Sequence, residues 1–321
     1  MLTSFSIVDQ RLQSRDGIAG DGDLWIDLLE PQKDEEKAVE ALCGIDVPTP
    51  EEMREIEFSS RLYHEDGAVF MTALVLSHTD KDDVISSPMT FILAGQRLIT
   101  MRFHEPRFFT AFTKRAQKTA MAGASADSVL VSLLEACLDR LADIIERVAH
   151  DIDKLSSEVF THTGDRRPGG LDYRTTLVNL GGKGDLLSDV RESLTTLDRL
   201  FGYLALEAAE RRLDKDLKAR IKTLSRDSRS LNDHLNFLSQ KVTFLLDATL
   251  GLINIEQNGI IKIFSVAAVV FLPPTLIASI YGMNFHFMPE LSWPWGYPLA
   301  IGGMVLSAIL PYLFFKQKGW L

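Results

Sequence analysis

The residues with the most specific chemical potential in this sequence lie near its C-terminus, on one face of an uncharged segment. At heptad spacing that face carries Asn258, Ile261, Ser265, Ala268, Leu272, Thr275, Ser279 and Gly282. Five of the eight are small or hydroxyl-bearing, and a sixth is asparagine. Amide, hydroxyl and carbonyl oxygens can bind the water shell of Mg²⁺, which gives up its waters reluctantly. Small and polar residues also let helices pack closely. The face is therefore either a packing surface or the lining of a narrow pore formed by several copies.

Two uncharged apolar segments flank the motif that follows this face. The first, 263–280, has eighteen residues, and the second, 297–315, has nineteen. A helix rises about 1.5 Å per residue and a bilayer core is about 30 Å thick, so each segment is just long enough to span it. Backbone groups inside a bilayer must pair within their own segment, which predicts two transmembrane helices. Two helices cannot enclose a pore, so either the pair anchors a soluble domain or several copies assemble around an axis.

Charged residues predict the orientation of this hairpin. Lys262 precedes the first segment, Lys316 and Lys318 follow the second, and the loop 282–296 has no Lys or Arg and one acid, Glu290. Because Lys and Arg accumulate on the cytoplasmic side, both termini are expected inside and the loop outside. The N-terminus lacks the basic and apolar regions of a signal peptide. We therefore expect a protein of the inner (plasma) membrane whose large N-terminal region stays in the cytoplasm.

The composition places limits on the partners of that N-terminal region. The net charge is −10, and residues 1–262 alone carry −11. Nucleic acid binding requires clustered basic residues, so no nucleic acid partner is expected. The acids either keep the protein soluble or also attract cations through a long-range field. Cys43 and Cys137 lie far apart in the sequence, and we expect no disulfide in a reducing compartment.

The periodicity predicts an α+β membrane protein with seven segments. They are a cytoplasmic α/β domain (1–125), antiparallel helices (126–212), a stalk helix (213–262), a first transmembrane helix (263–281), an outer loop (282–296), a second transmembrane helix (297–315) and a basic cytoplasmic tail (316–321). In the first segment, strands are predicted at 4–8, 24–29, 68–76 and 89–103, the last broken at Ala94-Gly95, and helices at 33–42, 50–58 and 108–121.

The long helices follow from apolar spacing and from the absence of proline. One helix is predicted at 126–160, a turn at 161–170, and a second helix at 171–211 that could break at Gly181-Gly182. From 213 nothing stops a helix before the membrane, which gives about 68 residues and about 100 Å at about 1.5 Å per residue. A heptad seam follows it: Leu231, Leu235, Leu238, Val242, Leu245, Thr249 and Leu252. The seam could pack on the chain's own helices, on sister chains, or on both.

The segment 254–321 resembles the CorA family of magnesium transporters. The resemblance rests on Tyr281-Gly282-Met283-Asn284, on the Met288-Pro289-Glu290-Leu291 loop, and on the basic end before Trp320-Leu321. Upstream, the chain resembles the family in layout more than in motif. The resemblance implies a homopentameric funnel in the membrane lipid, with the first transmembrane helix lining the pore and the second forming an outer ring.

The resemblance also implies roles for particular residues. Gly282, Met283 and Asn284 would form the selectivity filter, where five Asn284 amides bind hydrated Mg²⁺ through its waters, with Tyr281 and Glu290 in the outer loop. The implied pore-lining residues are Asn258, Ile261, Phe264, Leu272, Thr275 and Ser279. Phe264 lies one residue off the heptad face. Family members are gated by intracellular Mg²⁺ between cytoplasmic domains; the candidate acids here are Asp83, Asp151, Asp153 and Asp227, each of which could equally be a solvated surface residue.

The motifs and the charge pattern are compatible with three functions. The first is a potential-driven channel for Mg²⁺, and also for Co²⁺ and Ni²⁺, with no enzymatic activity. The second is a proton-coupled Zn²⁺ transporter of the same fold; no carboxylate lies within either apolar segment to relay protons, although His286 in the loop could ligate a softer ion. The third is a membrane-anchored enzyme, but residues 1–125 contain no nucleophile elbow, paired-His motif or phosphate loop.

Overall fold

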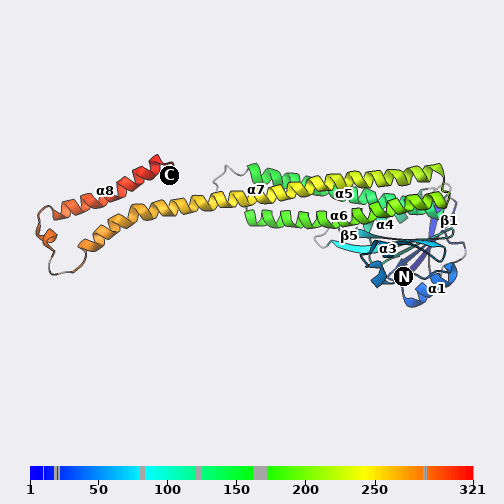
Figure 1. Ribbon diagram of the computed structural model, residues 1–321. Helices are drawn as coiled ribbons and strands as arrows, with labels where there is room; N and C mark the ends of the chain where they lie inside the picture. Colours follow the sequence, from blue (N-terminus) through cyan, green and yellow to red (C-terminus); the bar gives the residue numbers. More distant parts are fainter. Residues whose placement is uncertain are drawn as a thin grey trace. The chain divides into compact units, whose positions relative to one another are not determined.

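The computed structural model describes residues 1–9, 11–17, 20, 22–79, 84–119, 124–161, 172–284, 286 and 288–320. The chain divides into two compact units, Met1–Leu245 and Leu246–Leu321, and each is described here by itself. Figure 1 shows a sheet and several helices in the first unit, and the end of one long helix with a second apolar helix in the other.

A seven-stranded mixed sheet forms the base of the first unit. Its spatial order is β2-β1-β3-β7-β6-β5-β4, in which only β3 and β7 pair in parallel. The strands are β1 (Leu2–Val8), β2 (Arg11–Asp16), β3 (Trp25–Leu29), β4 (Leu62–Glu65), β5 (Ala68–Ser77), β6 (Ile85–Ala94) and β7 (Arg97–Arg102). The central strands are buried along nearly their whole length, which shows that both faces of the sheet are covered.

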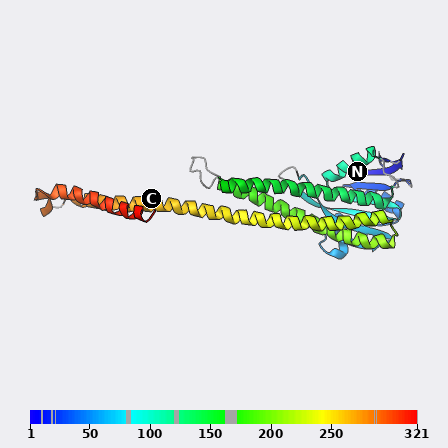
Figure 2. The same ribbon diagram turned by 90° about the horizontal axis from the view of Figure 1, so that it is seen from above.

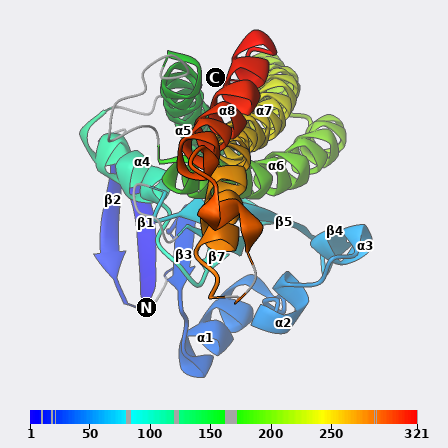
Figure 3. The same ribbon diagram turned by 90° about the vertical axis from the view of Figure 1, so that its left-hand side faces the viewer.

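Helices cover the two faces of the sheet separately (Figure 3). On one face lie three short helices, α1 (Lys33–Cys43), α2 (Pro50–Met53) and α3 (Phe58–Arg61). Ile26 and Leu28 of β3 join Val39 and Met53 in the core on that side. On the other face lie α4 (Arg107–Lys118), α5 (Ala126–Thr161) and α6 (Tyr173–Glu210). The alternation of side chains along each strand decides which residues enter which core.

The second core of the sheet contains a buried polar network. Asp27 of β3 accepts hydrogen bonds from the Arg102 guanidinium, at 2.8 Å from Nη2 to Oδ2, and from the Thr100 hydroxyl at 2.6 Å. Trp25 donates its indole N–H to Thr100 at 3.0 Å, and Arg102 lies 4.0 Å from the ring centre of Phe109. Burial raises the pKa of Asp27, while the neighbouring Arg102 opposes that shift. Loss of one partner would leave a buried charge alone, so the network must be kept or replaced as a whole.

Two long helices of the first unit pack with the beginning of a third. Figures 1 and 2 show α5, α6 and the start of α7 (Lys215–Tyr281) side by side. The heptad seam of α7 is buried there, including Leu235, Leu238, Val242 and Leu245. Val242 faces α6: Cγ1 of Val242 would lie 3.8 Å from a Cβ atom added at Gly184, which belongs to α6. The part of the heptad seam in this unit therefore packs on the chain's own helices, which is one of the alternatives that the heptad spacing left open.

The sequence predicted the long helices more accurately than the short elements. The helix predicted at 171–211 runs without interruption through Gly181-Gly182, and the predicted helix of about 68 residues is observed with 67, from Lys215 to Tyr281. The single helix predicted at 50–58 is wrong: α2 ends at Met53 and α3 begins at Phe58. Ile56 is 87% exposed, so no apolar stripe continues beyond Met53 to hold further turns on the core.

The second unit contains the apolar end of α7, a 3₁₀ turn η2 (Pro289–Ser292) and α8 (Gly296–Gln317). Both α7 and α8 are long and apolar enough to cross a membrane. Pro273 and Pro274 lie inside α7 and Pro311 inside α8. A proline has no N–H to donate, so each leaves one carbonyl of the preceding turn without its usual helical partner.

Candidate functional site

The apolar part of α7 has one face against α8 and another that this chain leaves exposed. Val266 is 4% exposed, and Val270, Pro273 and Ile277 on the same face are half-buried. Ile277 contacts α8, because a methyl group added at Gly303 would lie 4.0 Å from its Cδ1. The spacing of four, three and four residues keeps these side chains within one helical stripe.

Five of the six residues predicted to line a pore point away from the α8 side of α7, whereas Asn258 points only about 80° from Val266. At about 100° per residue, Ile261, Thr275 and Ser279 point about 140 to 220° away from Val266. All six of the predicted lining residues are exposed in this chain: Asn258, Ile261, Phe264, Leu272, Thr275 and Ser279. Phe264 points about 60° away from Ile261 but still away from α8. This face carries both polar and large apolar side chains and is left uncovered by the chain, as are Ile263 and Leu276 on other sides of the helix.

The Thr275 hydroxyl is oriented by its own helix. It donates its hydrogen to the Phe271 carbonyl oxygen at 2.7 Å. A hydroxyl has one hydrogen and two lone pairs, so its oxygen can still accept from a donor in front of the helix face. Water molecules bound to a cation are strong donors. The Thr275 oxygen therefore keeps an acceptor lone pair available on this face of the helix.

The residues predicted to form a selectivity filter directly follow the end of α7. The helix ends at Tyr281, after which Gly282 donates its N–H to the Ala278 carbonyl at 2.9 Å and Met283 donates to Ile280 at 3.3 Å. A Cβ at position 282 would lie 3.2 Å from the Ala278 oxygen, so this tight turn favours glycine. Asn284 comes next and is exposed. The three residues thus lie together at one end of the exposed face of α7.

The 3₁₀ turn η2 lies directly before α8. The Glu290 carbonyl accepts from the Trp293 N–H at 3.3 Å, and Gly296 donates to Trp293 at 2.9 Å. A Cβ added at Gly296 would lie only 2.3 Å from the Glu290 oxygen, so glycine is required there by close backbone approach. The Glu290 side chain and His286 are exposed. Glu290 is thereby held next to the start of α8 and remains open to solvent.

Two of the acids considered as regulatory candidates form ion pairs within the chain. Asp151 on α5 lies 2.5 Å from Nζ of Lys183 on α6. Asp153 pairs with Lys241 on α7, and the hydrogen bond from this lysine lowers the pKa of Asp153. Asp83 lies outside the described residues. These pairs connect α5 to both of its neighbours.

The remaining candidate, Asp227, belongs to an acidic group on α5 and α7. Burial, together with the charges of Glu135, Asp143 and Asp227, raises the pKa of Asp139, and Arg115 opposes the shift. Carboxylates that repel each other in this way would gain from a cation between them. Glu135 and Asp143 lie four residues to either side of Asp139 on α5, a spacing visible in the sequence, whereas only the fold brings Asp227 of α7 to this group.

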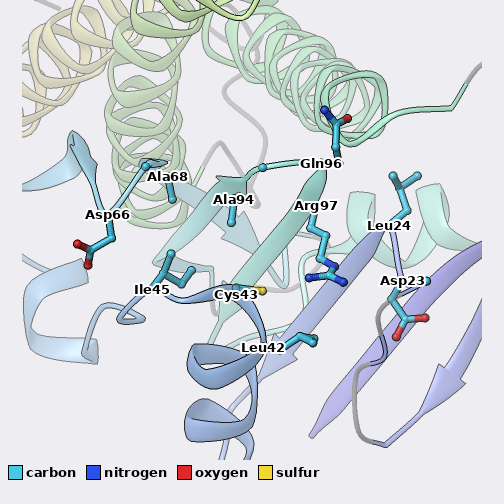
Figure 4. A pocket seen from close by; sticks show the side chains of 13 residues that line it. Asp23, Leu24, Leu42, Cys43, Ile45, Asp66, Ala68, Ala94, Gln96 and Arg97 are labelled. Atoms are coloured by element: carbon cyan, nitrogen blue, oxygen red, sulfur yellow. The ribbon is translucent and has the colours of Figure 1, made fainter.

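A separate pocket of about 470 Å³ lies at one end of the sheet (Figure 4). Asp23 and Arg97 contribute its charged side chains near β3 and β7, and Cys43 lies at the end of α1. Burial raises the pKa of the Cys43 thiol, with Arg97 opposing. A protonated thiol is a weak nucleophile, so Cys43 behaves as a packing residue of this pocket.

Comparisons with known proteins agree with the fold and with the apolar hairpin. Residues 21–317 match the family model described as CorA-like Mg²⁺ transporter protein. The chain is 40% identical over 299 residues to the magnesium transport proteins CorA of Salmonella typhimurium and of Escherichia coli K12, covering 93% of this chain and 92% of each relative. The chain belongs to the CorA-like Mg²⁺ transporter family, and it is a transmembrane protein with two C-terminal apolar helices.

A solved structure supports the same architecture over the full length. The structure of the CorA magnesium transporter from Methanocaldococcus jannaschii superposes with a TM-score of 0.78, covering 100% of this chain and 98% of that one at 21% identity. This likeness confirms the predicted fold class: a soluble α/β domain, a long helix and two C-terminal apolar helices.

Proposed function

We propose that this protein is a potential-driven Mg²⁺ channel, which also admits Co²⁺ and Ni²⁺. The observation that carries the proposal is the exposed face of α7, which lies opposite the face packed on α8 and ends at Gly282-Met283-Asn284. The relatives that are 40% identical over most of their length are magnesium transport proteins, which supports the choice of ion.

The channel forms when several copies place this face around an axis, and we propose five, in the inner (plasma) membrane with both termini in the cytoplasm. Five copies of Asn284 then present amide oxygens at the outer mouth, where they accept hydrogen bonds from the waters of Mg²⁺. Below them, Thr275 and Asn258 add further polar rings. Exposed Leu272, Phe264 and Ile261 form apolar constrictions that can stop the flow of water and ions.

The driving force in this mechanism is the membrane potential. An inside-negative potential contributes about 2.3 kcal/mol per charge per 100 mV, or about 4.6 kcal/mol for a divalent ion. The two apolar segments, 263–280 and 297–315, contain no acidic or basic residue, so the ion meets no charged site there at which it would be held. Weak binding through water is what a conducting pathway needs, because an ion must leave as readily as it enters.

The first experiment is uptake into proteoliposomes under an imposed inside-negative potential. Wild type is compared with Asn284→Ala, and Asn179→Ala, an exposed asparagine on α6, is the matched control. We expect Mg²⁺ entry that follows the potential, ignores a proton gradient, and falls at least about tenfold in Asn284→Ala only. Little Mg²⁺ entry combined with Zn²⁺ entry that rises with a proton gradient would replace this proposal with the proton-coupled Zn²⁺ transporter.

We also propose that intracellular Mg²⁺ closes the channel by binding between cytoplasmic domains. The acidic group around Asp139 and Asp227 supports this idea, because burial, followed by the charges of Glu135, Asp143 and Asp227, raises the pKa of Asp139, even though Glu135 also pairs with Arg220. A divalent ion would relieve that repulsion and favour the arrangement in which neighbouring subunits share it.

A further inference from the structure

Three potential metal ligands meet in the first unit, far in sequence from the ion pathway. His64 comes from β4, and Glu207 and Glu210 come from the last turns of α6. One ligand atom from each lies within 4.8 Å of the other two. Nε2 of His64 is 2.8 Å from Oε1 of Glu207. Two adjacent ligands at about 2.1 Å from an ion lie about 3 Å apart, so this pair has the spacing of neighbouring ligands.

The strand side of the group is fixed by a tight hairpin. Asp66 and Gly67 have φ of 49° and 75° and form a two-residue turn between β4 and β5. Tyr63 stacks on Phe70 with 4.7 Å between ring centres, on the side of the α1–α3 core. Side chains alternate along a strand, so His64 must point to the opposite side, where α6 lies.

The helix side is fixed by hydrogen bonds to the backbone of β5. The Ser193 hydroxyl donates to the Leu74 carbonyl at 2.7 Å, and the Leu74 N–H donates to Thr196 Oγ1 at 3.0 Å. These bonds set the position of α6 along β5 about three to four turns before Glu207. Glu207 and Glu210 are three residues apart and share a face of the helix. The three ligands are thus held by well-anchored elements.

Glu207 is the residue whose environment calls for a cation. Its side chain is only 6% exposed, and its Oε2 atom has no partner with hydrogen-bonding geometry among the described residues. Both acids lie at the C-terminal end of α6, where the helix dipole disfavours negative charge. Arg211, the next residue after the helix, pairs with Asp127 on α5.

Tyr203 lies one turn before Glu207, and its ring centre is 6.4 Å from that of His64. A cation at the group would satisfy the free carboxylate oxygen and offset both the charge repulsion and the unfavourable dipole.

We propose that His64, Glu207 and Glu210 bind a divalent transition metal ion such as Zn²⁺ or Co²⁺. An imidazole nitrogen favours these ions, whereas Mg²⁺ prefers oxygen ligands alone. Water completes the coordination on the exposed side of His64 and Glu210. The bound ion joins the edge hairpin β4–β5 to the end of α6 within one subunit. The site is separate from the ion pathway of α7 and does not depend on it.

The test is Co²⁺ binding to the purified full-length protein in detergent, with Mg²⁺ in large excess to fill sites built from oxygen alone. Bound Co²⁺ is counted after desalting, and its visible absorption reports nitrogen ligation. Wild type is compared with His64→Ala and Glu210→Gln, and His234→Ala, an exposed histidine on α7, is the matched control. The His64 side chain is 48% exposed and Glu210 is exposed, so the fold should tolerate their loss.

We expect wild type and His234→Ala each to bind one more Co²⁺ per chain than His64→Ala does. Glu210→Gln should bind this additional Co²⁺ at least about tenfold more weakly than wild type. Mg²⁺ uptake by His64→Ala should equal that of wild type, which shows that the assembly is intact. Equal Co²⁺ binding by wild type and His64→Ala would overturn the proposal, as would wild type that binds no Co²⁺ when Mg²⁺ is in excess.

Discussion

At the scale of single residues, the buried polar groups of the first unit are where small changes have large effects. His104 follows β7, is 8% exposed, and lies close to Arg102. Burial, followed by the charge of Arg102, lowers the pKa of His104 to about 4. The imidazole is therefore neutral in the folded protein at neutral pH, whereas in the unfolded chain it gains a proton below about pH 6.5.

This difference predicts a pH-dependent loss of stability. Between about pH 6.5 and pH 4 the unfolded chain binds the proton and the folded chain does not, so the free energy of unfolding falls as the pH falls, by up to about 3 kcal/mol from this residue. Thermal melting of wild type and His104→Phe over that range should show a flatter profile for the variant. His234→Phe serves as the control, and identical profiles for wild type and His104→Phe would contradict the prediction.

At the scale of elements, the contacts between α5 and α7 determine how the first unit responds to cations. The ion pairs of Asp151 and Asp153 hold α5 to α6 and α7 without help from an ion. The group around Asp139 is different, because like charges from α5 and α7 face each other. The two kinds of acid have the same appearance in the sequence and opposite electrostatic environments in the fold.

The raised pKa of Asp139 gives a prediction for this group. Because the pKa of Asp139 is higher in the folded state, the free energy of unfolding falls as the pH rises above the ordinary pKa of an aspartate. The ionised Asp139 side chain therefore destabilises the folded protein at neutral pH. Asp139→Asn should raise the melting temperature at pH 7, and added Mg²⁺ should stabilise wild type more than the variant. The control is Asp46→Asn in an exposed loop. A melting temperature that falls in Asp139→Asn, or an unchanged response to Mg²⁺, would exclude the acidic group as a Mg²⁺ site.

At the scale of the whole molecule, the face of α7 that is turned away from α8 is left uncovered by this chain. Ile261, Phe264 and Leu272 are 60 to 71% exposed, whereas Val266 on the face toward α8 is 4% exposed. Both faces carry apolar side chains, so hydropathy alone does not distinguish them. Their difference is the position of α8.

Cysteine cross-linking distinguishes the two faces in the assembled protein. In a background without Cys43 and Cys137, Ser279→Cys places a thiol on the face away from α8, and Ile277→Cys places one against Gly303 of α8. If copies surround a narrow axis, mild oxidation in membranes should link Ser279→Cys chains into dimers and leave Ile277→Cys chains monomeric on a denaturing gel. The reverse pattern would show that the face opposite α8 does not point to the axis.

The sequence alone predicted the elements that depend on local pattern and length. The helix from Lys215 to Tyr281, the two apolar segments and the Gly282-Met283-Asn284 motif could be identified because periodicity and the absence of charge persist over many residues. The edge strands β2 and β4 were missed. Leu12 is the single buried residue of β2 and Leu62 of β4, so neither strand has an alternating pattern, and only pairing with β1 and β5 creates them.

The sequence by itself therefore predicted the long helices and the two membrane segments from composition and spacing, and the resemblance of the Gly282-Met283-Asn284 motif added the family layout and the candidate ion pathway. The tertiary structure alone decided which acids have a lysine partner, which face of α7 is turned away from α8, and that His64 meets Glu207 and Glu210 across more than 140 positions. The physical reason is that charge interactions and metal coordination act over a few ångströms in space. Residues far apart in the chain reach those distances only when the sheet and the long helices have packed.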